Sequence, residues 1–264
     1  MRRTLVSFHA HPDDESIATG GVLARAVAEG HRVVLALATR GEVGEVDDGF
    51  LEDGETLGAR RTEETLRAAE ILGVHRVEFL GYRDSGTAGT PANGDPKAFW
   101  SADIGEAAAR LAALLNEEKA DVLTVYDDHG GYGHPDHIQV HRVGHRAADL
   151  AGTPQVFEST MNRDHIRRMM EQTLAGMSDS VEQPEMDIEE FGTPAALLTT
   201  AVDVRDFTGK KRAAMAAHAS QIGENSFFLQ MPEEIFTEAF GWEWFMRRGA
   251  APGIAESSLF EHLG

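Results

Sequence analysis

The sequence lacks cysteine altogether, and its 264 residues include only 24 lysines and arginines against 44 aspartates and glutamates. The absence of cysteine excludes disulfide bonds and thiolate metal ligands, so any bound metal ion must be held by histidine and carboxylate groups. The formal charge of -20 repels nucleic-acid phosphates and anionic lipid headgroups, so neither is an expected partner. A neutral or cationic small molecule would meet no such repulsion.

The N-terminal segment also lacks a long hydrophobic run. Residues 1–8 contain two arginines and only a few apolar side chains, and no signal-peptide-like or membrane-spanning stretch follows them. We therefore expect a cytoplasmic protein that does not associate with membranes. A Gly-x-Gly-x-x-Gly loop is likewise absent after the first apolar run, so binding of a dinucleotide such as NAD is not expected.

Short apolar runs alternate with helical patterns over the first 160 residues. The continuous apolar run at 31–39 is typical of a strand covered on both faces. The expected strands are 4–8, 31–39, 76–80, 121–126 and 155–160, and the expected helices are 20–29, 57–72, 103–118 and 135–150. This alternation predicts an α/β fold with a Rossmann-like parallel sheet and flanking helices.

The pattern weakens after residue 160. We expect residues 1–160 to form the catalytic core, and residues 161–264 to form a C-terminal α+β extension that packs on the core and shapes the substrate pocket. A strand is expected at 197–204 and a helix at 206–220. The acidic segment 176–194 is expected to be a solvated loop or lid, and the aromatic residues near 242–245 to belong to the core.

Two polar motifs follow predicted strands. The segment HPDD at 11–14 comes after the first strand, and HPDH at 134–137 comes after the fourth. In an open doubly wound sheet these two strands commonly lie side by side where the winding reverses, and ligands bind at their carboxyl ends. A catalytic zinc ion takes three protein ligands, drawn here from imidazole and carboxylate, plus water. We predict that His11, Asp14 and His137 are those ligands.

Asp13 remains free beside the predicted ligands and is the candidate general base. Non-haem iron oxygenases also use two histidines and one carboxylate, but those triads normally sit on β-jelly-roll scaffolds rather than on alternating strands and helices. A spare carboxylate also suits hydrolysis better. A protein that binds a sugar without turnover is the third alternative, and the full set of candidate catalytic residues disfavours it.

The segments VSFHAHPDDE and GGYGHPDH resemble the signatures of the PIG-L/LmbE-like zinc de-N-acetylase family. The resemblance covers roughly residues 1–160 and extends to Arg61-x-x-Glu64, to YRDSG at 82–86 and to KRAAMAAHASQI at 211–222. It is strongest to the bacterial mycothiol-pathway enzymes. These include a deacetylase of N-acetylglucosaminyl-inositol and an amidase of mycothiol S-conjugates, and GGYGHPDH together with DSG-x-AGT favours the deacetylase.

The resemblance implies a role for each motif residue. Zinc, with ferrous iron as the alternative metal, would be held by His11, Asp14 and His137, and Asp13 would act as base on the attacking water. His134 would stabilise the oxyanion and act as acid, with Asp136 orienting it and Tyr132 adding a donor. The residues implied to contact sugar or inositol hydroxyls are Glu45, Arg61 and Asp84.

The expected function is therefore hydrolysis of an N-acetyl group from an N-acetylglucosamine-type substrate, with the conjugate amidase as the alternative. The oligomeric state is left open. Three further histidine positions have simpler interpretations. His141 and His145 share a helical face with His137, which suggests a second metal site, although surface or supporting roles are favoured. His218, taken alone, is typical of a helix surface, whereas the resemblance makes it a motif residue.

Overall fold

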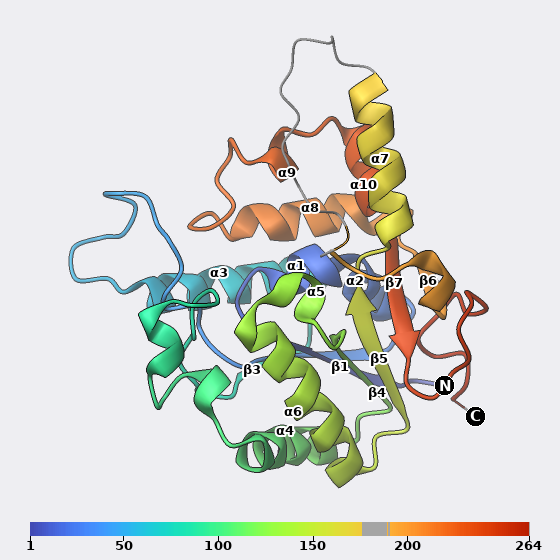
Figure 1. Cartoon of the computed structure of the whole chain (residues 1–264), viewed down its shortest axis with the longest axis horizontal. Coiled ribbons are helices and arrows are strands. Elements are labelled where there is room, and N and C mark those ends of the chain that lie inside the picture. The colour runs from blue at the N-terminus through green and yellow to red at the C-terminus, as the bar shows by residue number, and fades with distance from the viewer. Residues whose placement is uncertain (176–188, 190, 264) are drawn as a thin grey trace.

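The computed structural model describes residues 1–175, 189 and 191–263 (Figure 1). The described chain contains a seven-stranded sheet of order β3-β2-β1-β4-β5-β7-β6. Its strands are β1 (Thr4–His9), β2 (Arg32–Leu37), β3 (Arg76–Phe79), β4 (Val122–Tyr126), β5 (Gln155–Thr160), β6 (Thr200–Asp203) and β7 (Trp242–Arg247). None of the described helices is both long enough and apolar enough to span a bilayer.

The first five strands are parallel, and β1 lies between β2 and β4. The expected reversal of winding between the first and fourth strands is therefore present. Residues 9 and 126 end these two strands, so the loops that carry both motifs leave the same edge of the sheet. The alternating sequence pattern predicts this part of the fold correctly, because each buried strand is followed by a helix that covers it.

Two helical layers cover the sheet (Figure 1). Val6 and Phe8 point to one face, where they pack with α4 (Ile104–Glu118) and α6 (Pro135–Ala151). Leu5 points to the other face, where it packs with α2 (Gly20–Ala28), α3 (Leu57–Leu72) and α8 (Thr208–Ala217). Successive side chains of a strand point to opposite faces, so the apolar runs supply both cores at once. The remaining α-helices are α1 (Asp14–Ala18), α5 (Gly130–Gly133), α7 (Arg163–Ala175), α9 (Phe227–Gln230) and α10 (Glu233–Phe240).

The C-terminal part adds to the same sheet in a way that the sequence did not predict. β7 is antiparallel to both β5 and β6, so the parallel sheet expected for the N-terminal part is confirmed, and the C-terminal α+β part extends it into a mixed sheet. Phe245 is fully buried in the core as expected. Trp242 and Trp244 are half-buried and line a surface pocket instead.

Glu243 explains why the hydrophobic pattern of the sequence does not predict β7 as a strand. Its side chain points inward, where it accepts hydrogen bonds from the backbone N–H groups of Gly21 and Val22 and from the Lys211 ammonium at 2.6 Å. Trp242 and Trp244 point to the other face, so Glu243 puts a charge on the inward face that it shares with the apolar Phe245. The acidic segment 176–194, where a loop or lid is expected, lies mostly outside the described residues.

Candidate active site

The two motif loops meet at the carboxyl ends of β1 and β4. His134 is the N-cap of α6, and its ring accepts a hydrogen bond from the backbone N–H of Asp136. Gly130 precedes that helix with a φ of 69°. A Cβ at this glycine would lie 2.6 Å from the Cβ of His137, so only glycine allows the loop to approach α6 this closely.

Two imidazole nitrogens converge on one carboxylate oxygen. The Nδ1 atom of His11 and the Nε2 atom of His137 each lie 3.3 Å from Oδ2 of Asp14. The backbone N–H of His11 donates to the same oxygen at 2.8 Å, which holds the Asp14 side chain in place. Burial acts to raise the pKa of Asp14, but the charges of His137 and His11 outweigh burial and keep this pKa well below its usual range.

The far nitrogen of each ring already has a partner. His137 donates from Nδ1 to the carbonyl of Gly130 at 3.2 Å, and Nε2 of His11 lies 3.1 Å from Oδ2 of Asp136. A carbonyl or carboxylate oxygen only accepts, so the neutral rings keep their protons on these far nitrogens. Their lone pairs then face Asp14. Nε2 of His137 is buried and has no hydrogen-bond partner.

This arrangement fits a tetrahedral metal ion. Ligand atoms at roughly 2.0–2.2 Å from a tetrahedral ion lie about 3.3–3.6 Å from one another, which matches both spacings to Asp14. Imidazole lone pairs turned toward a carboxylate oxygen repel it unless a cation lies between them. Histidine ligands whose other N–H is held by a carbonyl or carboxylate are also the common pattern in metal sites. The residues therefore fit a metal ion.

A second grouping overlaps this one. His11, His134 and His137 offer ring nitrogens that all lie within 4.8 Å of one another, and a nitrogen of His11 lies within the same distance of carboxylate oxygens of Asp84 and Asp136. The carboxylates of Asp84 and Asp136 lie on the Nε2 side of His11, whereas Asp14 lies on the Nδ1 side. Burial acts against a charged His11, yet the surrounding carboxylates raise its pKa well above the usual value, so this pocket favours a positive charge.

Asp136 contacts a different histidine from the one expected. Its fully buried carboxylate accepts from His11, from the backbone N–H of Ser85 at 2.9 Å and from the Ser85 hydroxyl. Only its backbone N–H reaches His134. The sequence-based expectation that Asp136 orients His134 thus differs from the structure, in which the carboxylate orients His11.

His134 is held as a neutral hydrogen-bond donor. Because its Nδ1 accepts from a backbone N–H, the proton of the neutral ring lies on Nε2. Burial, with help from His11 and His137, lowers the pKa of His134 to about 4. The ring lies beside that of His11, with centroids 4.6 Å apart. His134 can therefore donate to an oxygen that gains negative charge.

Asp13 lies next to the convergent ligands in a strained backbone conformation with a φ of 93°. Such a conformation costs on the order of 1–3 kcal/mol outside glycine and persists only where neighbours hold it. Here the backbone N–H of Asp13 donates to Glu15, and its carboxylate lies 3.3 Å from the Arg61 guanidinium. Burial raises the pKa of Asp13 to about 6 against the opposing charge of Arg61, which suits a general base near neutral pH.

Arg61 is buried, with 4% exposure, and supports the site loops rather than facing open solvent. Its guanidinium donates to the carbonyl of Gly41 at 2.9 Å and to that of Pro12 at 2.5 Å. Glu64, one turn further along α3, is also buried, so it forms no surface pair with Arg61; its carboxylate accepts from the backbone N–H and hydroxyl of Ser220.

The other two residues implied to contact sugar are placed differently from each other. Asp84 is buried and accepts from the backbone N–H groups of Val43 and Gly86, while its Oδ1 lies 3.4 Å from Nε2 of His11. Glu45 is exposed, and only its carbonyl has a described bond, from Gln221. Tyr132 is 51% exposed, with its ring edge-on to His137 at 5.0 Å.

The structure adds supporting residues that the motif reading did not assign. His218 is fully buried and pairs with the fully buried Glu15 at 2.7 Å, so a position on the helix surface is wrong. His9 is also buried and contacts the Tyr126 hydroxyl at 2.8 Å. The Tyr126 ring stacks on His137 with centroids 4.3 Å apart. The signals available in the sequence were Glu15 in HPDDE and His218 in KRAAMAAHASQI.

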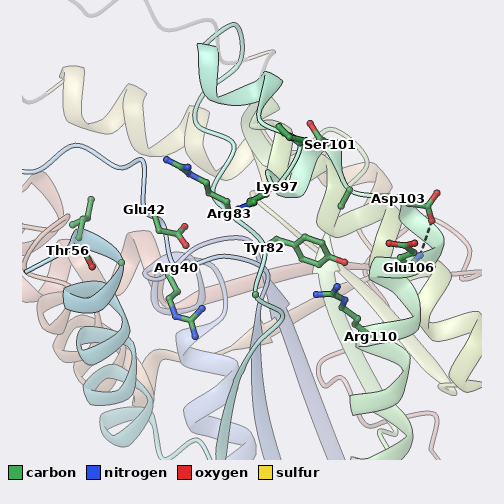
Figure 2. A pocket seen from close by; sticks show the side chains of 15 residues that line it. Arg40, Glu42, Thr56, Tyr82, Arg83, Lys97, Ser101, Asp103, Glu106 and Arg110 are labelled. Carbon is green, nitrogen blue, oxygen red and sulfur yellow. Dashed lines mark hydrogen bonds between the residues drawn. The ribbon is translucent and has the colours of Figure 1, made fainter.

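A polar pocket of about 710 Å³ adjoins the loops after β2 and β3. Arg40, Glu42 and Thr56 line one side, Tyr82 and Arg110 line the other, and Arg83 and Lys97 lie between them (Figure 2). The pocket contains none of the convergent metal-ligand candidates. It is nevertheless next to them, because Glu42 accepts a hydrogen bond from the backbone N–H of Asp84.

The chain matches the model of a family described as GlcNAc-PI de-N-acetylase (PIG-L) over residues 6–148, which is more than half of its length. The chain belongs to the PIG-L family. This PIG-L protein is also 40% identical over 289 residues to a 1D-myo-inositol 2-acetamido-2-deoxy-alpha-D-glucopyranoside deacetylase of Geodermatophilus obscurus. That match covers 99% of this chain and 98% of the relative.

Solved structures share the fold of this PIG-L protein at low identity. N,N'-diacetylchitobiose deacetylase from Pyrococcus horikoshii aligns with a TM-score of 0.59 and 20% identity, covering 99% of this chain and 86% of the other. A 4-carboxy-2-hydroxymuconate hydratase from Pseudomonas putida aligns with a TM-score of 0.57 and 18% identity, covering 94% and 97%. Because a deacetylase and a hydratase share this fold, the fold alone does not determine the reaction, and the site residues do.

Proposed function

We propose that the protein is a metal-dependent deacetylase that hydrolyses the N-acetyl group of an N-acetylglucosamine-type substrate, with N-acetylglucosaminyl-inositol as the foremost candidate. The observation that carries the proposal is the approach of His11 and His137 to one carboxylate oxygen of Asp14, beside the Asp13 carboxylate that Arg61 holds. The deacetylase name of the Geodermatophilus relative, which matches over nearly the full length, supports the substrate class.

We assign the metal ligands to His11, Asp14 and His137, and the ion to zinc with ferrous iron as the alternative. Imidazole nitrogen and carboxylate oxygen suit either ion. When bound, such an ion supplies a Lewis acid that polarises the amide carbonyl and makes water more acidic. His134 is left out of the ligand set because its proposed role requires a free N–H.

The remaining steps belong to the side chains. Asp13 takes a proton from the attacking water, since its carboxylate has a pKa of about 6 and is mostly ionised at pH 7. His134 donates from Nε2 to the carbonyl oxygen as that oxygen gains negative charge, a contribution of about 10²–10³ in rate for a single donor. Asp13 then passes the proton that it took from water to the leaving nitrogen, and the C–N bond breaks to give the free amine and acetate.

The partly buried network around Asp84 provides polar groups next to the reacting centre, and we propose that the polyol part of the substrate lies on this side. The polar pocket beside Glu42 offers both hydrogen-bond donors and acceptors, which suits hydroxyl groups. Tyr132, half-exposed at the other side of His137, is positioned to add a donor from the glycine-rich loop.

A substrate panel tests the proposal. Purified protein is stripped with a chelator, reloaded with zinc or ferrous iron, and assayed for release of free amine. The panel contains N-acetylglucosaminyl-inositol, a mycothiol S-conjugate, N-acetylglucosamine and short chito-oligosaccharides. We expect fastest release from N-acetylglucosaminyl-inositol and no release before metal is restored. Faster cleavage of the conjugate would assign the amidase activity instead, and no amine from any substrate would contradict the proposal.

A further inference from the structure

Helix α6 carries two more histidines beyond the active site. His141 and His145 follow His137 at intervals of four residues, which places the three on one face of the helix. The rings of His141 and His145 lie with centroids 4.5 Å apart and planes tilted by 55°. Neither side chain takes part in the proposed hydrolysis.

A carboxylate from β5 faces this histidine pair. Oε1 of Glu158 lies 2.8 Å from Nε2 of His145 and 3.8 Å from Nδ1 of His141. Each of the three residues offers a ligand atom within 4.8 Å of the other two. Their side chains are about one-fifth exposed, at 21%, 20% and 17% for His141, His145 and Glu158. An ion from solvent can therefore reach them.

The protonation of His141 is set by the backbone. Its Nδ1 lies 3.0 Å from the carbonyl oxygen of Tyr126, and a carbonyl only accepts, so neutral His141 carries its proton there. His141 would therefore bind an ion through the lone pair on Nε2 and not through Nδ1, the nitrogen that lies 3.8 Å from Glu158. The same relation holds between His137 and the Gly130 carbonyl one turn earlier. A backbone carbonyl that fixes the far nitrogen of a histidine is a common feature of metal ligands.

We propose that His141, His145 and Glu158 form a second, accessory site for a divalent transition-metal ion. Two imidazoles and a carboxylate suit Zn²⁺, Cu²⁺ or Ni²⁺, whereas Mg²⁺ and Ca²⁺ prefer oxygen ligands throughout. The site shares no residue with the His11–Asp14–His137 set. Binding is weaker than at that set, because the ion must displace the hydrogen bond between His145 and Glu158 and order three side chains that are about one-fifth exposed.

An ion at this accessory site would join α6 to β5 directly behind the active site. Tyr126 links the two places, since its carbonyl accepts from His141 while its ring stacks on His137. The simpler interpretation of the cluster is an ion pair between protonated His145 and Glu158, which needs neither His141 nor a metal. The two interpretations differ in metal stoichiometry.

The test is equilibrium dialysis of metal-free protein against buffered Zn²⁺ over a rising concentration series, with bound metal measured by mass spectrometry. We expect wild-type protein to bind a second equivalent at higher free Zn²⁺, and His141→Ala and His145→Ala to lose only that second equivalent. His137→Ala should lose the first and keep the second. Titration with Co²⁺ should give two absorption signals in wild-type protein and one in each variant.

His262→Ala is the matched control. His262 also pairs with a glutamate, Glu256, at 3.0 Å, but it belongs to none of the metal-competent groups found among the described residues. This variant should keep both equivalents, and unchanged thermal melting should show that all variants fold. A single equivalent in saturated wild-type protein would overturn the proposal. Two equivalents retained in His141→Ala or His145→Ala would overturn it as well.

Discussion

Asp136 should control metal affinity even though its side chain does not face the proposed ion. The carboxylate is fully buried, and its Oδ2 accepts from both His11 Nε2, at 3.1 Å, and the Ser85 backbone N–H, at 2.9 Å. Its other oxygen accepts from the Ser85 hydroxyl. Groups that hold a histidine ligand in this way typically contribute a factor of about 10–100 in metal affinity.

Asp136→Asn and Asp136→Ala should weaken zinc binding to different extents. In Asp136→Asn the amide oxygen can take the place of Oδ2, while the amide NH₂ faces the Ser85 hydroxyl, which can turn and accept. The hydrogen bonds survive and only the negative charge is lost, so we expect about tenfold weaker zinc binding, or about 1.4 kcal/mol. Asp136→Ala leaves two buried N–H donors unpaired, and we expect about a hundredfold loss with a lower melting temperature.

Competition with a chromophoric chelator measures the zinc affinity of each variant. Glu256→Gln is the matched control, because Glu256 is also a buried carboxylate that accepts from a hydroxyl, that of Thr200 at 2.7 Å, but it lies beside β6. Its zinc affinity should equal that of wild-type protein. If Asp136→Ala bound zinc as tightly as wild-type protein, the role of Asp136 in orienting His11 would be refuted.

Two further substitutions separate catalysis from support. Asp13→Asn should keep its metal content and lose at least about 10² in turnover, and turnover near that of wild-type protein would remove Asp13 from the mechanism. Arg61→Ala should lower the free energy of unfolding by about 1–3 kcal/mol, because the carbonyls of Gly41 and Pro12 lose their partner. It should also slow hydrolysis of N-acetylglucosaminyl-inositol and of a minimal acetamide equally. If Arg61→Ala slowed hydrolysis of the inositol substrate alone, Arg61 would be a contact of the sugar after all.

The convergence of the two motifs could be predicted from sequence because it depends on topology alone. A parallel sheet with a reversal between β1 and β4 brings the chain after His9 and the chain after Tyr126 to one edge, whatever the side chains are. The position of β7 could not be predicted in the same way. Its inward Glu243 is stabilised by Lys211 and the start of α2, partners more than thirty residues away that no local pattern reveals.

The supporting contacts escaped prediction for a related reason. Asp136 is 125 residues from His11, and His218 is 203 residues from Glu15. A motif of adjacent residues shows which groups are available, but the partner of each group depends on rotamers that packing selects. Asp136 lies next to His137 in sequence and close to His134, yet its carboxylate turns to His11, because Ser85 supplies two donors there.

These long-range contacts divide the site into two parts with different sensitivity. His11 depends on Asp136 and Ser85, which reach it from α6 and from the loop after β3. Asp13 depends on Glu15, which His218 holds from the end of α8. The metal ligands and the base are thus held by separate networks. Substitutions in the first network should change metal affinity, whereas those in the second should lower turnover while metal content is retained.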